Sequence, residues 1–137
     1  MTARIKLGTV VLCEHLVPGA NNKPTLINVY SGDIIVAQMP ATLIFGLFIE
    51  LPEAYPKEIE FELFLDRKKF AEMRAHIPEG NKSQSAIIGI PLIQMGIDKD
   101  LVFSIVAKAD GYANTTVVKR KIFKGDIPGI SPSAASE

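Results

Sequence analysis

The chain has 137 residues, and its 15 Lys and Arg balance its 15 Asp and Glu, so its net charge at pH 7 is zero. This length suits one domain, and a hydrophobic content of 47% with 22% charged residues supplies the apolar side chains that a core needs. The composition argues against global disorder, and the neutral charge argues against binding nucleic acid or an anionic membrane by bulk electrostatics.

Cysteine usage and the apolar runs indicate the compartment. Cys13 is the single cysteine and has no partner for a disulfide within the chain, which favours a reducing environment. The first apolar run ends at Glu14 and His15, before it reaches the length of a signal peptide. The run 43–49 is far shorter than the roughly 20 residues of a membrane-spanning helix. We therefore expect a cytoplasmic protein without a membrane span.

Pro, Gly, Asn and Asp divide the chain into short runs of strand length. The predicted strands, in chain order, are 5–16, 25–31, 41–50, 57–65, 70–77, 85–92, 101–109 and 115–124, with a short additional strand at 34–37. The run 57–65 alternates between an apolar and an acidic face. Its apolar face is Ile59, Phe61, Leu63 and Leu65, and its acidic face is Glu58, Glu60 and Glu62. The run 101–109 also alternates, and it ends at the turn Asp110-Gly111.

These strands define the expected fold class and domain. The 17 Ile and 9 Val against 11 Leu favour strands, because β-branched side chains suit a pleated surface. We predict an all-β fold, an antiparallel two-sheet β-sandwich of about eight strands, with a small β-barrel as the alternative. We expect a single domain over 1–127 and a flexible C-terminal tail over 128–137.

Two segments carry a family resemblance. Val11-Leu12-Cys13-Glu14-His15 reads as a strand that ends in an acidic residue, and 18–30 reads as a polar loop followed by a strand. The later order, an apolar strand, an alternating strand that ends in Asp and a hairpin with Asp-Gly, is similar too. The chain resembles a family of small bacterial β-sandwich domains with no assigned activity. It has Asn22-Lys23 where Gly-Lys is usual and Met95-Gly96-Ile97-Asp98 where Gly-x-Tyr is usual. The resemblance implies a fold and no catalytic residue.

Candidate chemistry is sparse. Cys13 and His15 share a strand face, but no third ligand or orienting group is evident, and a solitary cysteine is most often a buried one. His76 reads as a surface residue near the end of a strand. Phosphate loops, the GxSxG elbow, HExxH and CxxC pairs are missing from the sequence. We expect no enzyme, no catalytic residue and no cofactor.

Carboxylates in the loops are the candidates for a metal. With strands that alternate in direction, four of them fall at one end of the sandwich, and calcium takes its oxygen ligands from such loops. These calcium candidates are Asp33, Asp66, Asp98 and Asp100. The competing interpretation is that each Asp at a turn caps its own backbone, and the neighbouring Arg67 and Lys99 would neutralise the cluster.

A basic cluster lies on the last strand, at Lys119-Arg120-Lys121 with Lys124. Alternation places Lys119 and Lys121 on one face and Arg120 and Lys124 on the other, which argues against a nucleic-acid site. We interpret the lysines as protection of an edge strand, with the acidic face of 57–65 as a facing partner.

Two strands are apolar on both faces, although a sandwich requires one apolar face. The strand 41–50 places Leu43, Phe45 and Leu47 on one face and Ile44 and Phe48 on the other. The extra face is covered either by the chain itself, through 34–40 or 51–56, or by another subunit. We therefore hypothesise a homo-oligomer with Ile44 and Phe48 near the interface.

The sequence thus favours a non-enzymatic protein-interaction or structural module that binds protein, with another copy of itself as one partner. The alternative is a ligand-binding domain. Its ligand is Ca²⁺ at the Asp-rich end or a small molecule between the loops 17–24, 51–56, 78–84 and 110–114.

Overall fold

The computed structural model describes residues 3–19, 23–53, 55–77 and 86–126, and every regular element in these ranges is a strand. The strands are β1 (Ala3–Arg4), β2 (Val10–Val17), β3 (Thr25–Tyr30), β4 (Ile34–Val36), β5 (Ala41–Leu51), β6 (Glu58–Leu65), β7 (Lys68–His76), β8 (Ala86–Ile97), β9 (Leu101–Lys108), β10 (Tyr112–Ala113) and β11 (Thr115–Lys124).

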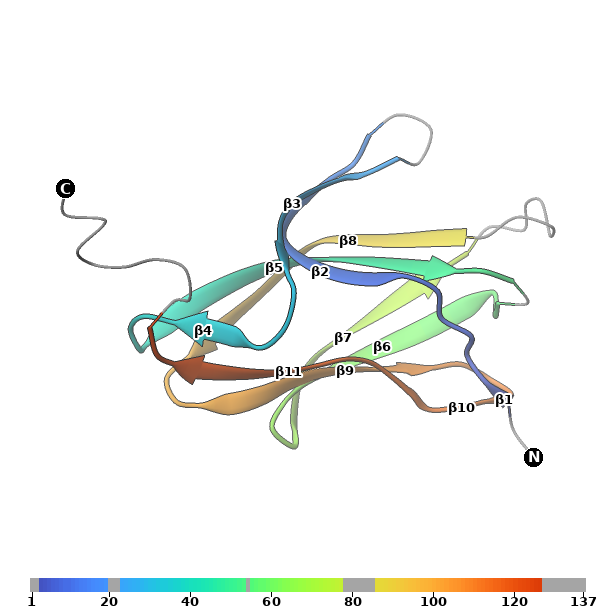
Figure 1. Cartoon of the computed structure of the whole chain (residues 1–137). Coiled ribbons are helices and arrows are strands. Elements are labelled where there is room, and N and C mark those ends of the chain that lie inside the picture. The colour runs from blue at the N-terminus through green and yellow to red at the C-terminus, as the bar shows by residue number, and fades with distance from the viewer. Residues whose placement is uncertain (1–2, 20–22, 54, 78–85, 127–137) are drawn as a thin grey trace.

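The strands form two packed layers. One sheet has five strands in the order β4-β11-β9-β6-β7, and the other has four in the order β3-β2-β5-β8. A small parallel pair, β1-β10, lies at one end of the molecule (Figure 1). In the described residues both larger sheets stay open and separate, which confirms the predicted sandwich and not its alternative.

The core lies between the two sheets and follows the predicted alternation. Ile59, Phe61 and Leu63 of β6 are buried, as predicted for the apolar face of that strand. Phe103 of the five-stranded sheet stacks on Phe45 of the four-stranded sheet, with ring centroids 5.5 Å apart. Aromatic and β-branched side chains therefore join the two layers, because each sheet can bury its apolar face only against the other.

The first predicted strand is wrong in its first half. Residues 5–9 are not part of a strand, and they carry the chain from β1 to β2 (Figure 1). The Gly8 amide donates to the Glu50 carbonyl at 2.7 Å, and the Glu50 amide donates to the Thr9 carbonyl at 2.8 Å. Ile5 is buried in the core, so this segment closes one side of the sandwich.

Strand β8 is longer than predicted and continues through Pro91 to Ile97. Its pairing with β5 is irregular there, because Phe45 pairs with Ile93 whereas Leu47 pairs with Ile90. A proline is tolerated at a bulge or on an edge strand, where its missing N–H disrupts no ladder. The predicted tail over 128–137 lies outside the described residues, and no helix in the described part of the chain is long and apolar enough to cross a membrane.

Candidate functional site

The four-stranded sheet carries the exposed large hydrophobic side chains of the described residues, and each of its strands contributes. We call this set the apolar surface, and it consists of Val17, Ile27, Val29, Ile44, Ile87 and Leu92. The exposed fractions are 39% for Ile44, 43% for Ile87 and 59% for Leu92. Within the described ranges, the five-stranded sheet has no exposed large hydrophobic side chain in this set. A sheet face in water is normally polar, so an apolar concentration on one sheet marks an interaction surface.

Leu16 of the hairpin β2–β3 covers part of the outer face of this sheet, and the far end of the hairpin rises away from the sheet in Figure 1. Beyond Cys13, β2 leaves its pairing with β5 and approaches β8. Leu16 lies over two glycines: its backbone N is 2.9 Å from where a Cβ at Gly46 would be, and its Cδ2 is 3.4 Å from where a Cβ at Gly89 would be. The glycines therefore make room for the hairpin to lie against the sheet.

This arrangement explains why β5 is apolar on both faces. Phe48 is half-buried and pairs with Val11 and Gly89, whereas Ile44 pairs with Gln94 and is exposed. The expectation that 34–40 covers this face is wrong, because β4 pairs with β11 in the opposite sheet. Self-coverage by the hairpin is incomplete, and Ile44 is one of the residues left in solvent.

Cys13 is fully buried and has the environment of a structural thiol. Its Sγ donates to the carbonyl of His15 at 3.2 Å and lies 3.5 Å from the carbonyl of Gly46. Burial raises the pKa of the Cys13 thiol above its ordinary value of 9.0, and backbone hydrogen bonds oppose the shift. A neutral, inaccessible thiol is a poor nucleophile. His15 is exposed on the hairpin, and His76 is exposed on β7, where its Nδ1 is 3.5 Å from Glu58 Oε1.

Three of the four calcium candidates are used as acceptors for backbone amides of neighbouring strands. Asp66 Oδ1 accepts from Val102 N at 3.0 Å. Asp33 Oδ1 accepts from Lys121 N at 3.0 Å, and Asp100 Oδ1 accepts from Lys124 N at 3.1 Å. Among the described residues these carboxylates and that of Asp98 do not form a group with ligand spacing. These three carboxylates accept from the backbone of other strands, whereas the competing interpretation expected each Asp to cap its own turn.

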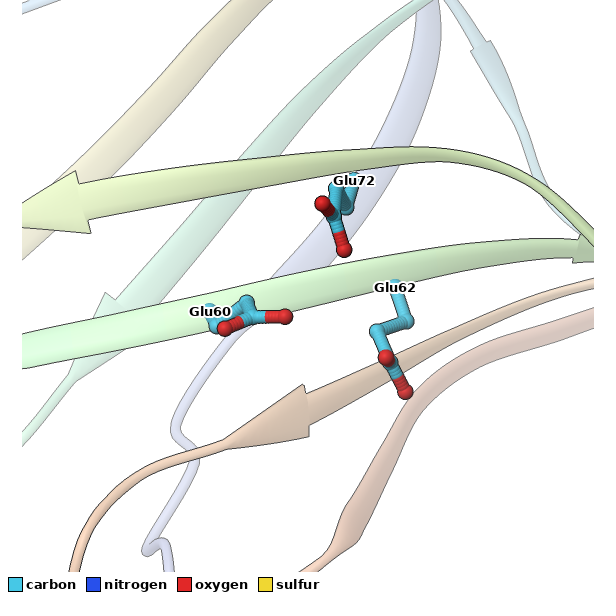
Figure 2. Close-up of side chains that lie close together, drawn as sticks. All are labelled: Glu60, Glu62 and Glu72. Atoms are coloured by element: carbon cyan, nitrogen blue, oxygen red, sulfur yellow. The ribbon is translucent and has the colours of Figure 1, made fainter.

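The carboxylates that do come together are those of Glu60, Glu62 and Glu72, whose ligand atoms lie within 4.8 Å of one another on β6 and β7 (Figure 2). Each has a cationic neighbour. Glu62 lies 2.9 Å from Lys108 Nζ and 3.3 Å from Lys69 Nζ. Lys69 also contacts Glu72 at 3.2 Å, and Arg74 contacts Glu60 at 3.5 Å. Three cations balance three carboxylates, which makes this group a charged outer face rather than a metal centre.

The predicted partner of this acidic face is wrong. Glu58, Glu60 and Glu62 face the basic residues of β7 and β9, and not the basic cluster on β11. β4 pairs with β11 only at residues 122–124, so among the described residues the stretch 115–121, with Lys119 and Lys121, remains at the edge of the sheet. Lys119 and Lys121 are exposed, whereas Arg120 is half-buried on the face of Val118 and Ile122.

A polar cleft of about 720 Å³ opens at one end of the five-stranded sheet. It adjoins two of the loops predicted to hold a small molecule, 51–56 and 110–114, and is lined among others by Pro56, Arg74, His76, Lys108 and Tyr112. Within the cleft Arg74 pairs with Glu60 and His76 lies against Glu58, whereas Lys108 of β9 pairs with Glu62. The loop 78–84 lies outside the described residues.

Comparison with protein-family models finds no match, and comparison with the curated proteins finds none. The resemblance to small bacterial β-sandwich domains therefore stays a prediction, as does the cytoplasmic location.

Proposed function

We propose that this chain is a non-enzymatic protein-interaction module that binds a second copy of itself through its four-stranded sheet. One observation carries the proposal. The exposed large hydrophobic side chains of the described residues are all on this sheet, on β2, β3, β5 and β8. Removal of such side chains from water is the dominant favourable contribution to most protein associations.

The apolar surface is large enough to take part in an interface. Its six side chains together expose on the order of 500 Å² over four strands, and one partner contributes ~800 Å² to a standard interface. The net charge of the chain is zero, so two copies approach without long-range repulsion.

Light scattering coupled to size exclusion tests the proposal over a concentration series from low to high micromolar. The wild type is expected to reach twice the chain mass of 14.9 kDa. Leu92→Lys places a charge on the apolar surface, and this variant is expected to remain at the mass of one chain. The matched control Thr116→Lys adds the same charge at an exposed position of β11, and it is expected to dimerise. A wild type that stays monomeric at every concentration refutes self-association.

The polar cleft supports a second candidate, a small molecule that carries both charges. The cleft's position between two of the predicted loops and its mixed lining favour this ligand class. Thermal unfolding with free amino acids at millimolar concentration tests it. A ligand is expected to raise the midpoint of thermal unfolding of the wild type, because binding to the native state stabilises it by mass action. The midpoint of Arg74→Gln is expected to stay unchanged, because this variant lacks a charged group of the cleft.

A further inference from the structure

Strand β8 forms an unprotected edge of the four-stranded sheet. Its twelve residues include no charged side chain. The other edges are blunted in ways that discourage strand pairing. β7 carries Lys68, Lys69, Glu72 and Arg74. The part of β11 that β4 does not cover, 115–121, carries Lys119, Arg120 and Lys121. β4 has three residues, and β3 has six and is interrupted by Asn28 at a φ of 56°. A long uncharged edge presents unpaired backbone N–H and C=O groups that can template a further strand.

An apolar groove adjoins this edge, on the open side of the sandwich between β7 and β8. The groove measures about 550 Å³ and is lined mostly by apolar side chains of both sheets, among them Met73, Ile77 and Ile88, and Arg74 and His76 of β7 also lie in its lining. A strand added to β8 would lie over the groove and turn alternate side chains into it. Its remaining side chains would lie beside Ile87 and Leu92, which are exposed on the outer face.

We propose that β8 of one copy pairs antiparallel with β8 of a second copy across a twofold axis, so that two four-stranded sheets continue as one eight-stranded sheet. This inference rests on the proposed function and narrows it, because it places the contact at the β8 edge, where Ile87 lies, and leaves Val17, Ile27 and Val29 of β2 and β3 outside it. The backbone edge supplies the hydrogen bonds, and apolar pairs on both faces supply the buried area.

The chemistry of β8 identifies a second copy as the occupant. A strand without charges meets itself across a twofold axis without like-charge repulsion, which β7 with its lysines would not do. β8 also provides apolar side chains on both of its faces. Ile88 and Ile90 lie beside the groove, and Ile87 and Leu92 are exposed on the outer face.

Proline limits where the axis can lie. Pro91 has no N–H, and it stays outside the stretch in which β8 pairs with β8 only when the axis lies at residue 88 or before, so the axis falls within 86–88. Residue 87 of one copy is then directly opposite residue 87 of the other or, for an axis one residue away, diagonal to it at about 7–8 Å. Ile44 has a similar exposure on the same face, but it belongs to β5, the next strand inward. Because neighbouring strands lie about 4.8 Å apart, residue 44 of the two copies is separated by about 14 Å or more.

Cysteine cross-linking tests this geometry. Ile87→Cys and its matched control Ile44→Cys are each treated with a mild oxidant that joins only adjacent thiols, and native Cys13 is buried and does not interfere. Ile87→Cys is expected to form a covalent dimer at least about tenfold faster than Ile44→Cys, because thiols held together react at an effective millimolar concentration. Light scattering and circular dichroism of each variant establish that it is folded and assembled.

The outcomes separate this inference from the proposed function. A dimeric wild type in which Ile87→Cys fails to cross-link, or cross-links no faster than Ile44→Cys, overturns β8 pairing and leaves self-association standing. A wild type that is monomeric at high micromolar concentration overturns both.

Discussion

Replacement of Gly46 by alanine tests whether the hairpin β2–β3 lies tightly against the four-stranded sheet. A Cβ at this position would lie 2.8 Å from Leu16 Cβ, 2.9 Å from Leu16 N and 3.1 Å from Cys13 Sγ. Two of these neighbours are a backbone atom and the first side-chain atom, so no rotamer change relieves the overlap and the hairpin itself must shift.

The magnitude follows from two opposing effects. Overpacking of a closely packed site costs about 1–3 kcal/mol, and alanine in place of a strand glycine recovers about 0.5–1 kcal/mol. We expect Gly46→Ala to lower the free energy of unfolding by about 1–2 kcal/mol. Truncation of Leu16 to alanine in the same chain does not restore it, because the Cβ and the backbone N of residue 16 remain.

Gly89→Ala is the matched control for this prediction. Its Cβ would meet the end of the Leu16 side chain at 3.4 Å and 3.6 Å, which is ordinary contact with a group that can rotate. We expect Gly89→Ala to be neutral or slightly stabilising. Urea unfolding of all variants at one chain concentration measures the differences, since self-association makes stability depend on concentration. Equal stability of Gly46→Ala and Gly89→Ala would refute the close approach of the hairpin.

Three further predictions concern single side chains. The hydrogen bond from Lys108 holds the pKa of Glu62 below its ordinary value of 4.5, so its stabilisation is complete above the unfolded pKa and is lost as the pH falls through the folded one. Glu62→Gln should therefore destabilise the protein near neutral pH, and the difference in unfolding free energy should shrink in acid; a difference that grows there contradicts the ion pairs. Cys13 should react with Ellman's reagent only on unfolding, whereas Thr116→Cys adds an exposed thiol that reacts at once; fast labelling of native wild type would contradict its burial. Asp66→Ala should lower the free energy of unfolding by about 1 kcal/mol, because Val102 N loses its acceptor. Asp66→Asn should lower it less, because asparagine keeps an acceptor and tolerates the φ of 55°. Addition of Ca²⁺ should leave the midpoint of thermal unfolding of the wild type unchanged.

The strands themselves could be predicted because their signals are local. Alternation in β6 places Ile59 and Phe61 in the core and the glutamates on the opposite face, where Glu62 is buried beneath its two lysines, without reference to any other strand. The turn-forming residues Asp66 and Asp110-Gly111 likewise mark the ends of β6 and β9. Such patterns record only how a strand divides its side chains between two faces.

Neighbour relations could not be predicted, because they depend on pairing between distant segments. Nothing in the alternation of β6 indicates that β7 and β9, rather than β11, lie beside it, and nothing at 34–36 indicates parallel pairing with β11. The missed feature of the candidate site is the hairpin that crosses the sheet. Its signal was present as Gly46 and Gly89 within two apolar strands, where a glycine often marks a close approach of another backbone.

The measurement that tests self-association most directly is the mass of the wild-type chain in solution, by light scattering from low to high micromolar concentration. Self-association through the four-stranded sheet predicts a shift from 14.9 kDa toward twice that mass. The shift is expected to be absent in Leu92→Lys and present in Thr116→Lys. A mass of 14.9 kDa at every concentration would contradict self-association through the four-stranded sheet.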